Sequence, residues 1–307
     1  MTESVEFGGR RLRLSNLDKR LYPGAHGCSK AEVISYYASI APVLLPHLRG
    51  RPVTLRRFPN GVQHKNFVQK HAGADTPDWI RTELVPGRSS APVRHAVLEE
   101  DAALVWAANL AALELHVPQW RFGTRGAARH QPKPPDLMVF DLDPGAPAGV
   151  VECCAVAVTL RERLAEDGLR AWPKTSGGVG LHLLVPVRTK DAAATSAYAR
   201  HLAQELTGEL PEQVLWRMNR DQRPGKVFVD WSQNNPAKTT VAPYSLRGRD
   251  SPTVSTPLTW TEVESCTTAA SLTFTASMLA DRIDEHGDLL AGMAQHAAAV
   301  PATTKGP

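Results

Sequence analysis

The sequence predicts a fold that mixes helices and strands, α/β or α+β, with a central, mainly antiparallel sheet. Residues 26–116 are mainly helical in pattern with short strands, whereas residues 136–250 alternate strand-like and helix-like stretches. The chain has 307 residues, which is enough for one large domain or two small ones. Its apolar share of 42% excludes a wholly disordered protein.

Composition also excludes several classes of protein. The sequence lacks the ~20 consecutive apolar residues of a membrane helix, and its first residues, MTESVEFGGRRLRL, contain no apolar signal core. We therefore expect a cytoplasmic protein without membrane contact. The four cysteines form no C-x-x-C pair, which argues against a zinc knuckle.

The first predicted helix begins near Ser29. Ser29-x-x-Glu32 has the pattern of a capping box, and apolar residues follow at helical spacing. Lys30 falls in the first turn, where free backbone N–H groups favour an anion. Further along, residues 98–116 read as one mostly buried helix.

The stretch DLMVFDLDPG, residues 136–145, predicts a strand that ends in two carboxylates. Strand side chains alternate between faces, so Asp141 and Asp143 point the same way. Two carboxylates so close repel each other unless a cation lies between them, and oxygen ligands suit Mg²⁺ or Mn²⁺. The alternative is a turn that uses aspartate for its turn propensity.

The next elements add polar groups. A helix at about 148–167 precedes two strand-like runs around the glycine-rich turn TSGGVGLH, which carries Ser176, Gly177 and His182. Such a turn can cradle a phosphate, although an ordinary hairpin loop is the alternative. A helix near 191–208 follows, and then a strand, Lys226–Trp231, with Asp230 near its end. Asp230 would complete a three-carboxylate metal site if it lies near Asp141.

Basic residues are clustered although the net charge is only +4. The clusters contain Arg49, Arg51, Arg56, Arg57, Lys65 and Lys70; Arg121, Arg125, Arg129 and Lys133; and Arg217, Arg220, Arg223 and Lys226. Aromatic residues are interleaved with them, which favours a nucleic-acid partner over a merely solvated face. Arg247 and Arg249 share a face if their segment is extended, and two guanidinium groups can hold a triphosphate.

Taken together, VFDLDPG, TSG-x-x-GLH, KVFVDWSQN and TTVAPYSLRGR, in this order, resemble the polymerase domain of bacterial DNA ligase D. That domain belongs to the archaeo-eukaryotic primase superfamily. LSNLDKRLYP, GRPVTLRRFPNGV and LELHVPQWRF match as well, so that the resemblance extends from about residue 10 to 290. It implies an α+β fold, a primase-like catalytic core whose central, mainly antiparallel sheet is flanked by helices.

The resemblance also implies roles for individual residues. It places two divalent cations, Mn²⁺ or Mg²⁺, on Asp141, Asp143 and Asp230, with His116 close to the active centre. Contacts to a nucleoside triphosphate would fall on Ser176, Gly177, His182, Arg247 and Arg249. Contacts to DNA would fall on Lys19 and Lys30 at a 5′-phosphate, and on Arg56, Phe67 and Arg223. Val179 and Val68 depart from the family pattern. At Val179, either nucleotide affinity is lower or Lys174 supplies the missing lysine contact, and at Val68 one stacking platform for template bases is missing.

The function that follows is an enzyme that adds nucleotides at DNA ends and fills short gaps, with a preference for ribonucleotides, in double-strand break repair by non-homologous end joining. We expect one primase-like domain over residues 1–295, in which 10–130 bind the DNA end and 131–295 form the catalytic core, with a disordered tail at 296–307. The expected partners are Ku and a DNA ligase, for a monomer in the nucleoid. A non-catalytic module that binds DNA ends and a de novo primase are the alternatives. No K-x-D-G adenylation motif occurs, which leaves open a stand-alone polymerase or an excised domain.

Overall fold

The computed structural model describes residues 2–24, 27–85, 91–123 and 129–303. The chain forms two compact units, and both are discontinuous in sequence. Unit 1 contains Met1–Pro132, Thr240–Ser255 and Phe274–Gly287, and unit 2 contains Lys133–Thr239, Thr256–Thr273 and Asp288–Pro307. The first boundary between the units lies between Pro132 and Lys133, and the segment that carries Arg247 and Arg249 belongs to unit 1.

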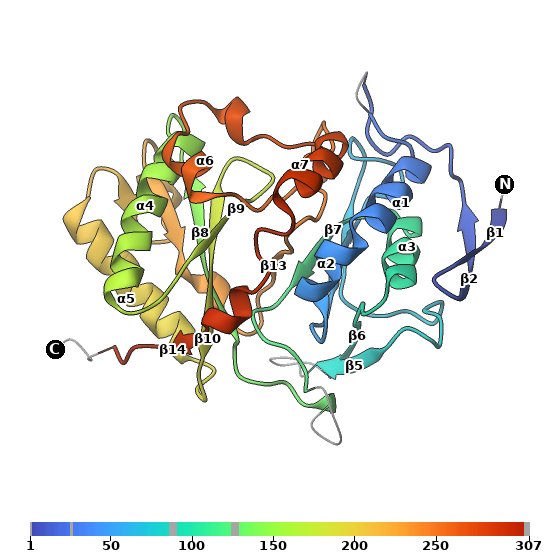
Figure 1. The fold of residues 1–307 in the computed structure, drawn as a ribbon, viewed down its shortest axis with the longest axis horizontal. Helices are drawn as coiled ribbons and strands as arrows, with labels where there is room; N and C mark the ends of the chain where they lie inside the picture. Colours follow the sequence, from blue (N-terminus) through green and yellow to red (C-terminus); the bar gives the residue numbers. More distant parts are fainter. Residues whose placement is uncertain (1, 25–26, 86–90, 124–128, 304–307) are drawn as a thin grey trace. The chain divides into compact units, whose positions relative to one another are not determined.

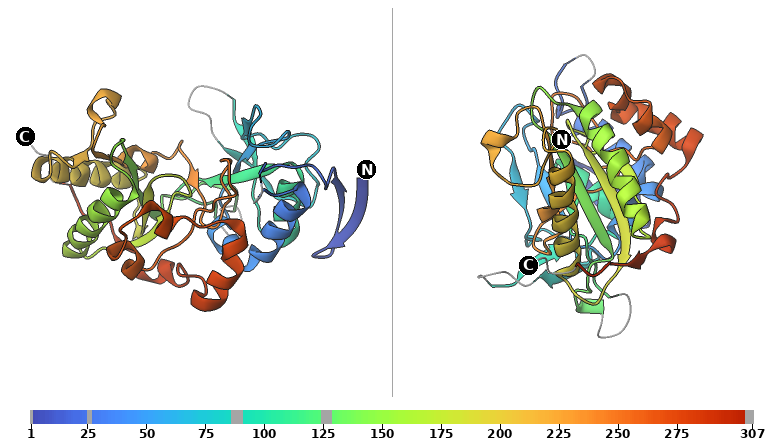
Figure 2. Two further views of the ribbon diagram at one scale, coloured as in Figure 1. Left: turned by 90° about the horizontal axis from the view of Figure 1, so that it is seen from above. Right: turned by 90° about the vertical axis from the view of Figure 1, so that its left-hand side faces the viewer.

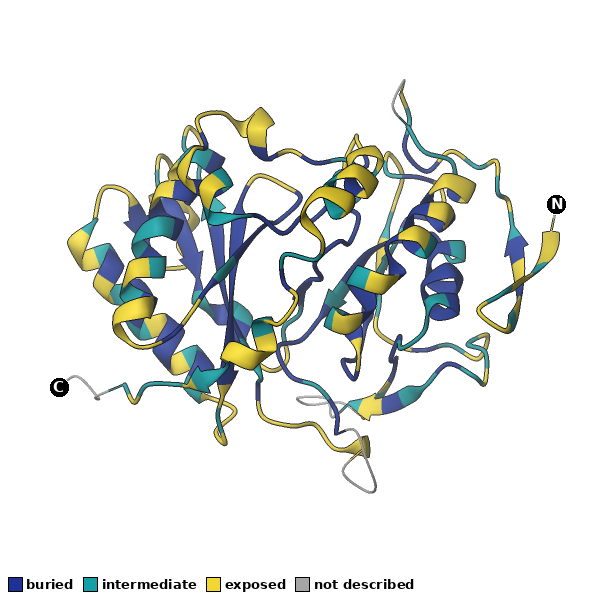
Figure 3. Ribbon diagram, in the orientation of Figure 1, coloured by how far each residue is buried: buried dark blue, intermediate teal, exposed yellow. Residues whose placement is uncertain are grey.

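Unit 2 is built on a sheet with the strand order β11-β12-β8-β10-β14, to which β9 adds beside β10. The pairs β12–β8, β8–β10 and β10–β9 are antiparallel, whereas the strands β11 and β14 pair in parallel with β12 and β10. The bounds are β8 Leu137–Pro144, β9 Trp172–Thr175, β10 Leu181–Arg188, β11 Val214–Leu215, β12 Val227–Asp230 and β14 Ala298–Ala299. The sheet is buried along β8 and β10 (Figure 3), as expected for strands that are apolar on both faces.

Two long helices pack against this sheet (Figures 1 and 2). They are α4, Val150–Glu166, and α5, Ala194–Glu209, and a short α6 spans Trp260–Glu264. The helix α4 buries an apolar stripe that includes Cys153, Val156, Ala157 and Leu160, with the periodicity of an amphipathic helix. Short 3₁₀ turns complete the unit at Arg220–Gln222, Trp231–Asn234, Ala269–Leu272 and Met293–His296.

Unit 1 contains a smaller sheet in the order β13-β7-β3-β4, all antiparallel. Its strands are β3 Thr54–Arg57, β4 Phe67–Gln69, β7 Ala112–Val117 and β13 Thr240–Val241. Two hairpins accompany it: β1 Thr2–Phe7 with β2 Arg10–Ser15, and β5 Thr82–Val85 with β6 Val93–Ala96. The first hairpin projects at the N-terminal end of the chain (Figure 2).

The helices of unit 1 are α1 Lys30–Ser39, α2 Ala41–Leu48, α3 Asp101–Asn109 and α7 Leu279–His286, which a 3₁₀ turn at Ala276–Met278 precedes. The predicted capping box is confirmed, because the Ser29 hydroxyl accepts from the Glu32 N–H while the Glu32 carboxylate accepts from the Ser29 N–H. The helix α1 packs against α3. Buried tyrosines fix its position, since Tyr36 and Tyr37 donate to the carbonyls of Tyr244 and Leu113.

One predicted element is wrong. Residues 98–116 do not form a single helix, because α3 ends at Asn109 and Ala111 adopts a positive φ of 56°. A left-handed residue cannot continue a right-handed helix. The chain then enters strand β7, in which Leu113 and Leu115 are fully buried and Glu114 and His116 point to the opposite face. The sequence did not reveal this short strand, because the residues on both sides of the turn at Ala111 are apolar and together resemble one buried helix.

The remaining predictions of elements agree with the structure, including the helices at 150–166 and 194–209 and the mixed α+β class. The C-terminal region differs from expectation, since Ala298–Ala299 pairs with Val187 and Arg188 of β10 although disorder was expected from residue 296. Backbone hydrogen bonds of the β10 edge hold these small residues in place. Within the described ranges, no helix is long and apolar enough to cross a membrane.

Candidate functional site

The carboxylate site of unit 2 lies across three neighbouring strands. Asp141 on β8 is in register with His182 on β10 and with Asp230 on β12. The side chains of His182 and Asp141 meet, with 3.1 Å between Nε2 and Oδ1. The predicted proximity of Asp230 to Asp141 is thus provided by the pairing of β12 with β8, which spacing in the sequence did not reveal.

Gln233 joins the two carboxylates. Its Nε2 donates to Asp141 Oδ2 at 3.2 Å and to Asp230 Oδ2 at 3.0 Å. Asp230 also accepts from the Ser232 N–H at 3.0 Å and from the Ser232 hydroxyl. The Lys238 ammonium lies 3.9 Å from Asp230 Oδ2. Two carboxylate oxygens therefore converge on one small donor, which is a set of ligands that fits a hard divalent cation.

Asp143 lies two residues along β8 from Asp141, and it is opposite Phe228 of β12. Among the residues that the structure describes, no group of three His, Cys, Asp or Glu side chains is arranged to hold a metal ion. The geometry thus supports Asp141 and Asp230 as a pair, and the third ligand stays a prediction. Arg223 also lies near this strand pair, since its guanidinium stacks 4.0 Å above the Phe228 ring.

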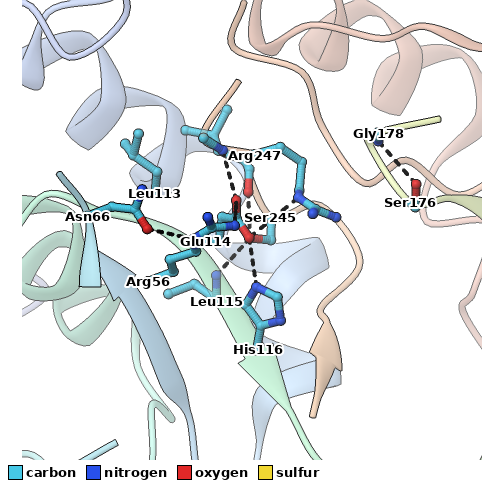
Figure 4. A network of polar contacts seen from close by, with 12 residues as sticks. Arg56, Asn66, Leu113, Glu114, Leu115, His116, Ser176, Gly178, Ser245 and Arg247 are labelled. Atoms are coloured by element: carbon cyan, nitrogen blue, oxygen red, sulfur yellow. Dashed lines mark hydrogen bonds and ion pairs between the residues drawn. The ribbon is translucent and has the colours of Figure 1, made fainter. Parts of the chain in front are cut away.

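Ser176 bridges the glycine-rich turn by two hydrogen bonds. Its hydroxyl accepts from the N–H groups of Gly178 at 3.1 Å and Gly180 at 3.2 Å, and the first of these bonds is drawn in Figure 4. Gly177 has a φ of 69°, which favours glycine. A Cβ at Gly180 would come within 2.1 Å of the Leu142 carbonyl oxygen. The turn therefore packs tightly against β8, the strand of the two aspartates.

Lys174 is in register with His182 and has no exposed surface. Its Nζ lies 3.5 Å from the Thr175 carbonyl oxygen. In this conformation it is too deep to contact a ligand directly, so that its role as a replacement for the family's missing lysine stays a prediction.

A second polar network lies in unit 1 and centres on Glu114 of β7 (Figure 4). The Glu114 carboxylate is 3.2 Å from Arg56 Nη1, 3.5 Å from Arg247 Nε and 2.8 Å from His116 Nε2. It also accepts from the Gly248 N–H at 3.0 Å. Three of the predicted residues, Arg56, His116 and Arg247, are therefore brought together by one acid that the sequence reasoning did not select.

The titration of this network follows from its charges. Burial by itself would raise the pKa of Glu114, but the hydrogen bond from His116, the nearby Arg247 and the Gly248 N–H lower it to about 2. Burial lowers the pKa of His116, and Arg247 and Arg56 lower it further against the opposing effect of Glu114. At neutral pH, Glu114 is therefore charged and His116 is neutral. His116 then donates from Nε2 to Glu114 and presents Nδ1 as an acceptor.

The segment around Arg247 is fixed along β7. The Ala242 N–H donates to the Leu115 carbonyl at 2.9 Å, and the Leu115 N–H donates to the Ser245 hydroxyl at 2.9 Å. A Cβ at Gly248 would lie 2.0 Å from Cζ of Phe58, so this position requires glycine. Arg249 follows on the exposed surface. The Arg-Gly-Arg segment is thus attached to its surroundings through the backbone at Gly248, with one basic side chain on each side of that residue.

Lys19 and Lys30 are also neighbours in unit 1. The Lys30 N–H donates to the Lys19 carbonyl at 2.8 Å. Lys30 Nζ donates to the Ser15 carbonyl at 2.5 Å, and Lys19 Nζ donates to Asn60 Oδ1 at 2.7 Å. Burial, followed by the charges of Lys19 and Arg57, lowers the pKa of Lys30 to about 8. Lys30 thus lies within electrostatic reach of two other cations, Lys19 and Arg57, an arrangement that an anion stabilises.

The expectation that free N–H groups at the start of α1 assist Lys30 is wrong. The N–H groups of Lys30 and Ala31 donate to the carbonyls of Lys19 and Leu17, and that of Glu32 donates to the Ser29 hydroxyl. These bonds satisfy the helix end internally. The positive charges of the side chains, and not free backbone donors, are left as the basis of this candidate anion site.

Phe67 is an exposed aromatic residue on the edge strand β4, with 44% of its surface accessible. The Arg57 guanidinium lies 5.1 Å from the centre of its ring. Val68, where many family members have a second aromatic residue, is exposed as well. Arg125, a member of one basic cluster, lies outside the described residues.

Sequence reasoning missed Glu114, Gln233, Asn60 and Lys238. A signal for Glu114 existed, because an acid between two leucines in LELH has the alternation of a half-buried strand. Its assignment to a helix concealed that alternation. Gln233 follows Asp230 in a 3₁₀ turn, and its approach to Asp141 depends on strand pairing that the sequence does not display.

Comparison with known proteins agrees with these features. The profile of the family described as "LigD, primase-polymerase domain" matches residues 29–290. A multifunctional non-homologous end joining protein LigD of Mycolicibacterium smegmatis is 44% identical over 284 residues, which cover 92% of this chain and 36% of that protein. A bifunctional LigD of Bacillus subtilis is 31% identical over 90% of this chain and 43% of its own length. The chain thus spans less than half of the length of these relatives.

A solved structure is similar over nearly its whole length. It is the polymerase domain from Mycobacterium tuberculosis ligase D in complex with DNA. The sequence identity is 40%, the TM-score is 0.88, and the match covers 94% of this chain and 99% of that one. The resemblance drawn from the motifs is therefore confirmed, as are the α+β class and the polymerase class of the fold. The chain belongs to the LigD primase-polymerase domain family.

Proposed function

We propose that this protein is a metal-dependent nucleotidyltransferase that extends and fills DNA ends during non-homologous end joining. The observation that carries the proposal is the row of His182, Asp141 and Asp230 across three adjacent strands. Its carboxylates converge on a single donor, Gln233. A module that only binds DNA has no use for two buried carboxylates in contact with one donor, since such groups are costly to bury.

Asp141 and Asp230, with Asp143 as the predicted third ligand, would hold Mn²⁺ or Mg²⁺. A bound divalent cation supplies Lewis acidity and charge compensation for phosphoryl transfer. The protein's own contribution is positional. Ser232 and Gln233 fix the carboxylate of Asp230, and the contact with His182 fixes that of Asp141. His116, neutral and oriented by Glu114, would accept a hydrogen bond from a hydroxyl group near the reacting atoms.

Contacts to a nucleoside triphosphate are predicted in the glycine-rich turn of unit 2 and, separately, in the Arg-Gly-Arg segment of unit 1. Ser176, Gly177 and His182 would provide polar contacts, and Lys174 is the predicted replacement for the family's lysine. Arg247 and Arg249 would bind phosphate oxygens through charge-assisted hydrogen bonds. A preference for ribonucleotides belongs to this proposal and rests on the family resemblance.

The DNA would be bound mainly through residues 10–130. Lys19 and Lys30 would bind the 5′-phosphate, Phe67 would stack on template bases, and Arg56 would lie on the template side. Arg223, in the loop before β12, would contribute from residues 131–295. We further propose that the protein acts as a monomer in the nucleoid, together with Ku and a DNA ligase.

Primer extension tests the proposal. A gapped DNA with a recessed 3′-hydroxyl, nucleoside triphosphates and Mn²⁺ should give extension, and Mg²⁺ should be compared in parallel. The same DNA with a 3′-deoxy terminus should give none. Extension without any primer would instead identify a de novo primase. DNA binding without incorporation under every metal condition would overturn the enzyme and leave the end-binding module.

A further inference from the structure

Glu114 is the common partner of groups from three separate segments of unit 1. Arg56 comes from β3, His116 from β7 itself, and Arg247 with Gly248 from the segment after β13. Glu114 has only 1% of its side chain exposed. We propose that Glu114 is a positioning residue: it holds the Arg-Gly-Arg segment in the geometry that binds the polyphosphate of the incoming nucleotide, and it holds Arg56 ordered for a phosphate of the template strand.

Three contacts restrain Arg56, although its side chain is 37% exposed. Nη1 pairs with Glu114 at 3.2 Å, Nε donates to Asn66 Oδ1 at 3.0 Å, and the guanidinium lies 5.4 Å from the centre of the Phe58 ring. An exposed arginine ordinarily loses side-chain entropy when it binds an anion. Arg56 is already ordered, so it binds at a lower entropic cost.

The Arg-Gly-Arg segment is positioned through its backbone as well as through a side chain. Glu114 Oε1 accepts from the Gly248 N–H, and Oε2 faces Arg247 Nε at 3.5 Å. The Phe58 ring occupies the space beside Gly248 where a Cβ would lie. Phe58 also stacks with Arg56. Glu114 and Phe58 thus both fix the position of this segment, Glu114 through its charge and Phe58 through its shape.

The charge balance points to an anionic ligand. One carboxylate faces two guanidinium groups, and the neutral histidine adds no charge, so the cluster retains net positive charge at neutral pH. A ligand with several phosphate groups complements it. This inference rests on the proposed function, because it assigns the excess positive charge to the nucleotide of the polymerase reaction.

The test compares Glu114→Gln with Glu83→Gln. Glu83 is a matched control, since it is also buried in unit 1 and pairs with one arginine, Arg81, and one histidine, His130. Initial rates of primer extension should be measured against nucleotide concentration, along with the Tm of each variant. Glu114→Gln should raise the nucleotide KM about tenfold or more, in addition to any change in kcat that follows from its contact with His116. Glu83→Gln should leave KM unchanged, whatever its effect on Tm.

Gly248→Ala offers a second route that changes no charge. The added methyl group must displace the segment from Phe58, so the nucleotide KM should rise here too. Glu114→Asp keeps the charge with a shorter reach and should recover part of the affinity lost in Glu114→Gln. Direct nucleotide binding by calorimetry should follow the same order.

Three results are distinguishable. If Glu114→Gln lowers Tm as Glu83→Gln does but leaves the nucleotide KM at the wild-type value, Glu114 is only structural and the inference is overturned. If all variants share one raised KM, Glu83→Gln included, the effect is general and the inference fails as well. If the wild type neither binds nor incorporates a nucleotide, it is the proposed function that fails.

Discussion

Each unit contains a histidine whose Nε2 meets a carboxylate on a sheet strand, but the two pairs differ in their surroundings. In unit 1 the pair is His116 with Glu114, and two arginines and a backbone N–H complete the shell of the acid. In unit 2 the pair is His182 with Asp141, and the neighbour of the acid on β12 is another acid, Asp230. The first acid is compensated by protein charges, whereas the second adds negative charge to a neighbouring carboxylate.

This difference separates two uses of a buried carboxylate. An acid between two arginines acts as an anchor, because it orders the guanidinium groups and leaves net positive charge for an anion. Two acids that share the amide of Gln233 gather negative charge at a point where a small hard cation fits. We therefore expect substitutions of Asp141 or Asp230 to affect chemistry and substitutions of Arg247 to affect nucleotide binding.

The largest effect is expected in unit 2. Asp141→Ala or Asp143→Ala should lower nucleotide incorporation by about a thousandfold or more, since several kcal/mol of charge stabilisation are lost with the cation. DNA affinity, measured by fluorescence anisotropy, should change little because the phosphate contacts lie on other residues. Glu212→Ala, which removes an exposed carboxylate of unit 2, is the control. Normal extension by either aspartate variant would disprove the metal-site assignment.

The next effect should appear in nucleotide binding. Arg247→Ala and Arg249→Ala should each weaken it by about tenfold to a hundredfold, as expected for the loss of a charge-assisted hydrogen bond. His182→Ala should weaken nucleotide binding as well. Arg247→Ala should in addition lower Tm, since it removes a partner of buried Glu114. Arg249→Ala should leave Tm unchanged, because Arg249 is exposed. Unchanged affinity in all three variants would make these residues structural.

Acid should weaken unit 1 through Glu114. The folded pKa is about 2 and the ordinary value is 4.5, so the acid's contribution to stability is present above pH 4.5 and is lost as the pH falls towards 2. Its size is on the order of 3 kcal/mol. Denaturant unfolding at pH 6 and pH 3 should show a smaller loss in Glu114→Gln than in the wild type. Equal losses would place the acid sensitivity elsewhere.

The smallest expected effect concerns the DNA end. The wild type should prefer a gapped DNA with a 5′-phosphate over one with a 5′-hydroxyl by several-fold, and added salt should reduce the preference. Because the pKa of Lys30 is about 8, the preference should also decline between pH 7 and pH 9 as its charge is lost. Competition binding measures it, with the Lys19→Ala/Lys30→Ala double variant as control. A preference that persists in this variant would exclude both lysines from phosphate recognition.

The sequence predicted what depends on local chemistry. The capping box at Ser29, the strand that carries Asp141 and Asp143, and the turn around Ser176 each depend on residues within a few positions of one another. Neighbouring residues determine helix caps, the alternation of strand side chains and tight turns, so the local sequence is sufficient to predict these elements.

What the sequence could not predict depends on pairing over long distances. Asp230 reaches Asp141 because β12 pairs with β8, and Glu114 acquires Gly248 because the segment after β13 runs along β7. The strand at 112–117 was missed because the turn at Ala111 uses a left-handed residue that is not glycine. Such a conformation is uncommon for alanine and carries no signal in the sequence.

The order in which unit 1 is assembled has a consequence for protein synthesis. Met1–Pro132 leaves the ribosome first, but Ser245 and Gly248, which complete the shell of Leu115 and Glu114, belong to Thr240–Ser255. At translation rates of about 5–20 residues per second, this second segment follows after roughly ten seconds. During that interval Glu114 can pair with Arg56 and His116, but it lacks Arg247 and the Gly248 N–H. Unit 1 therefore cannot complete its core during translation until much of unit 2 has been made.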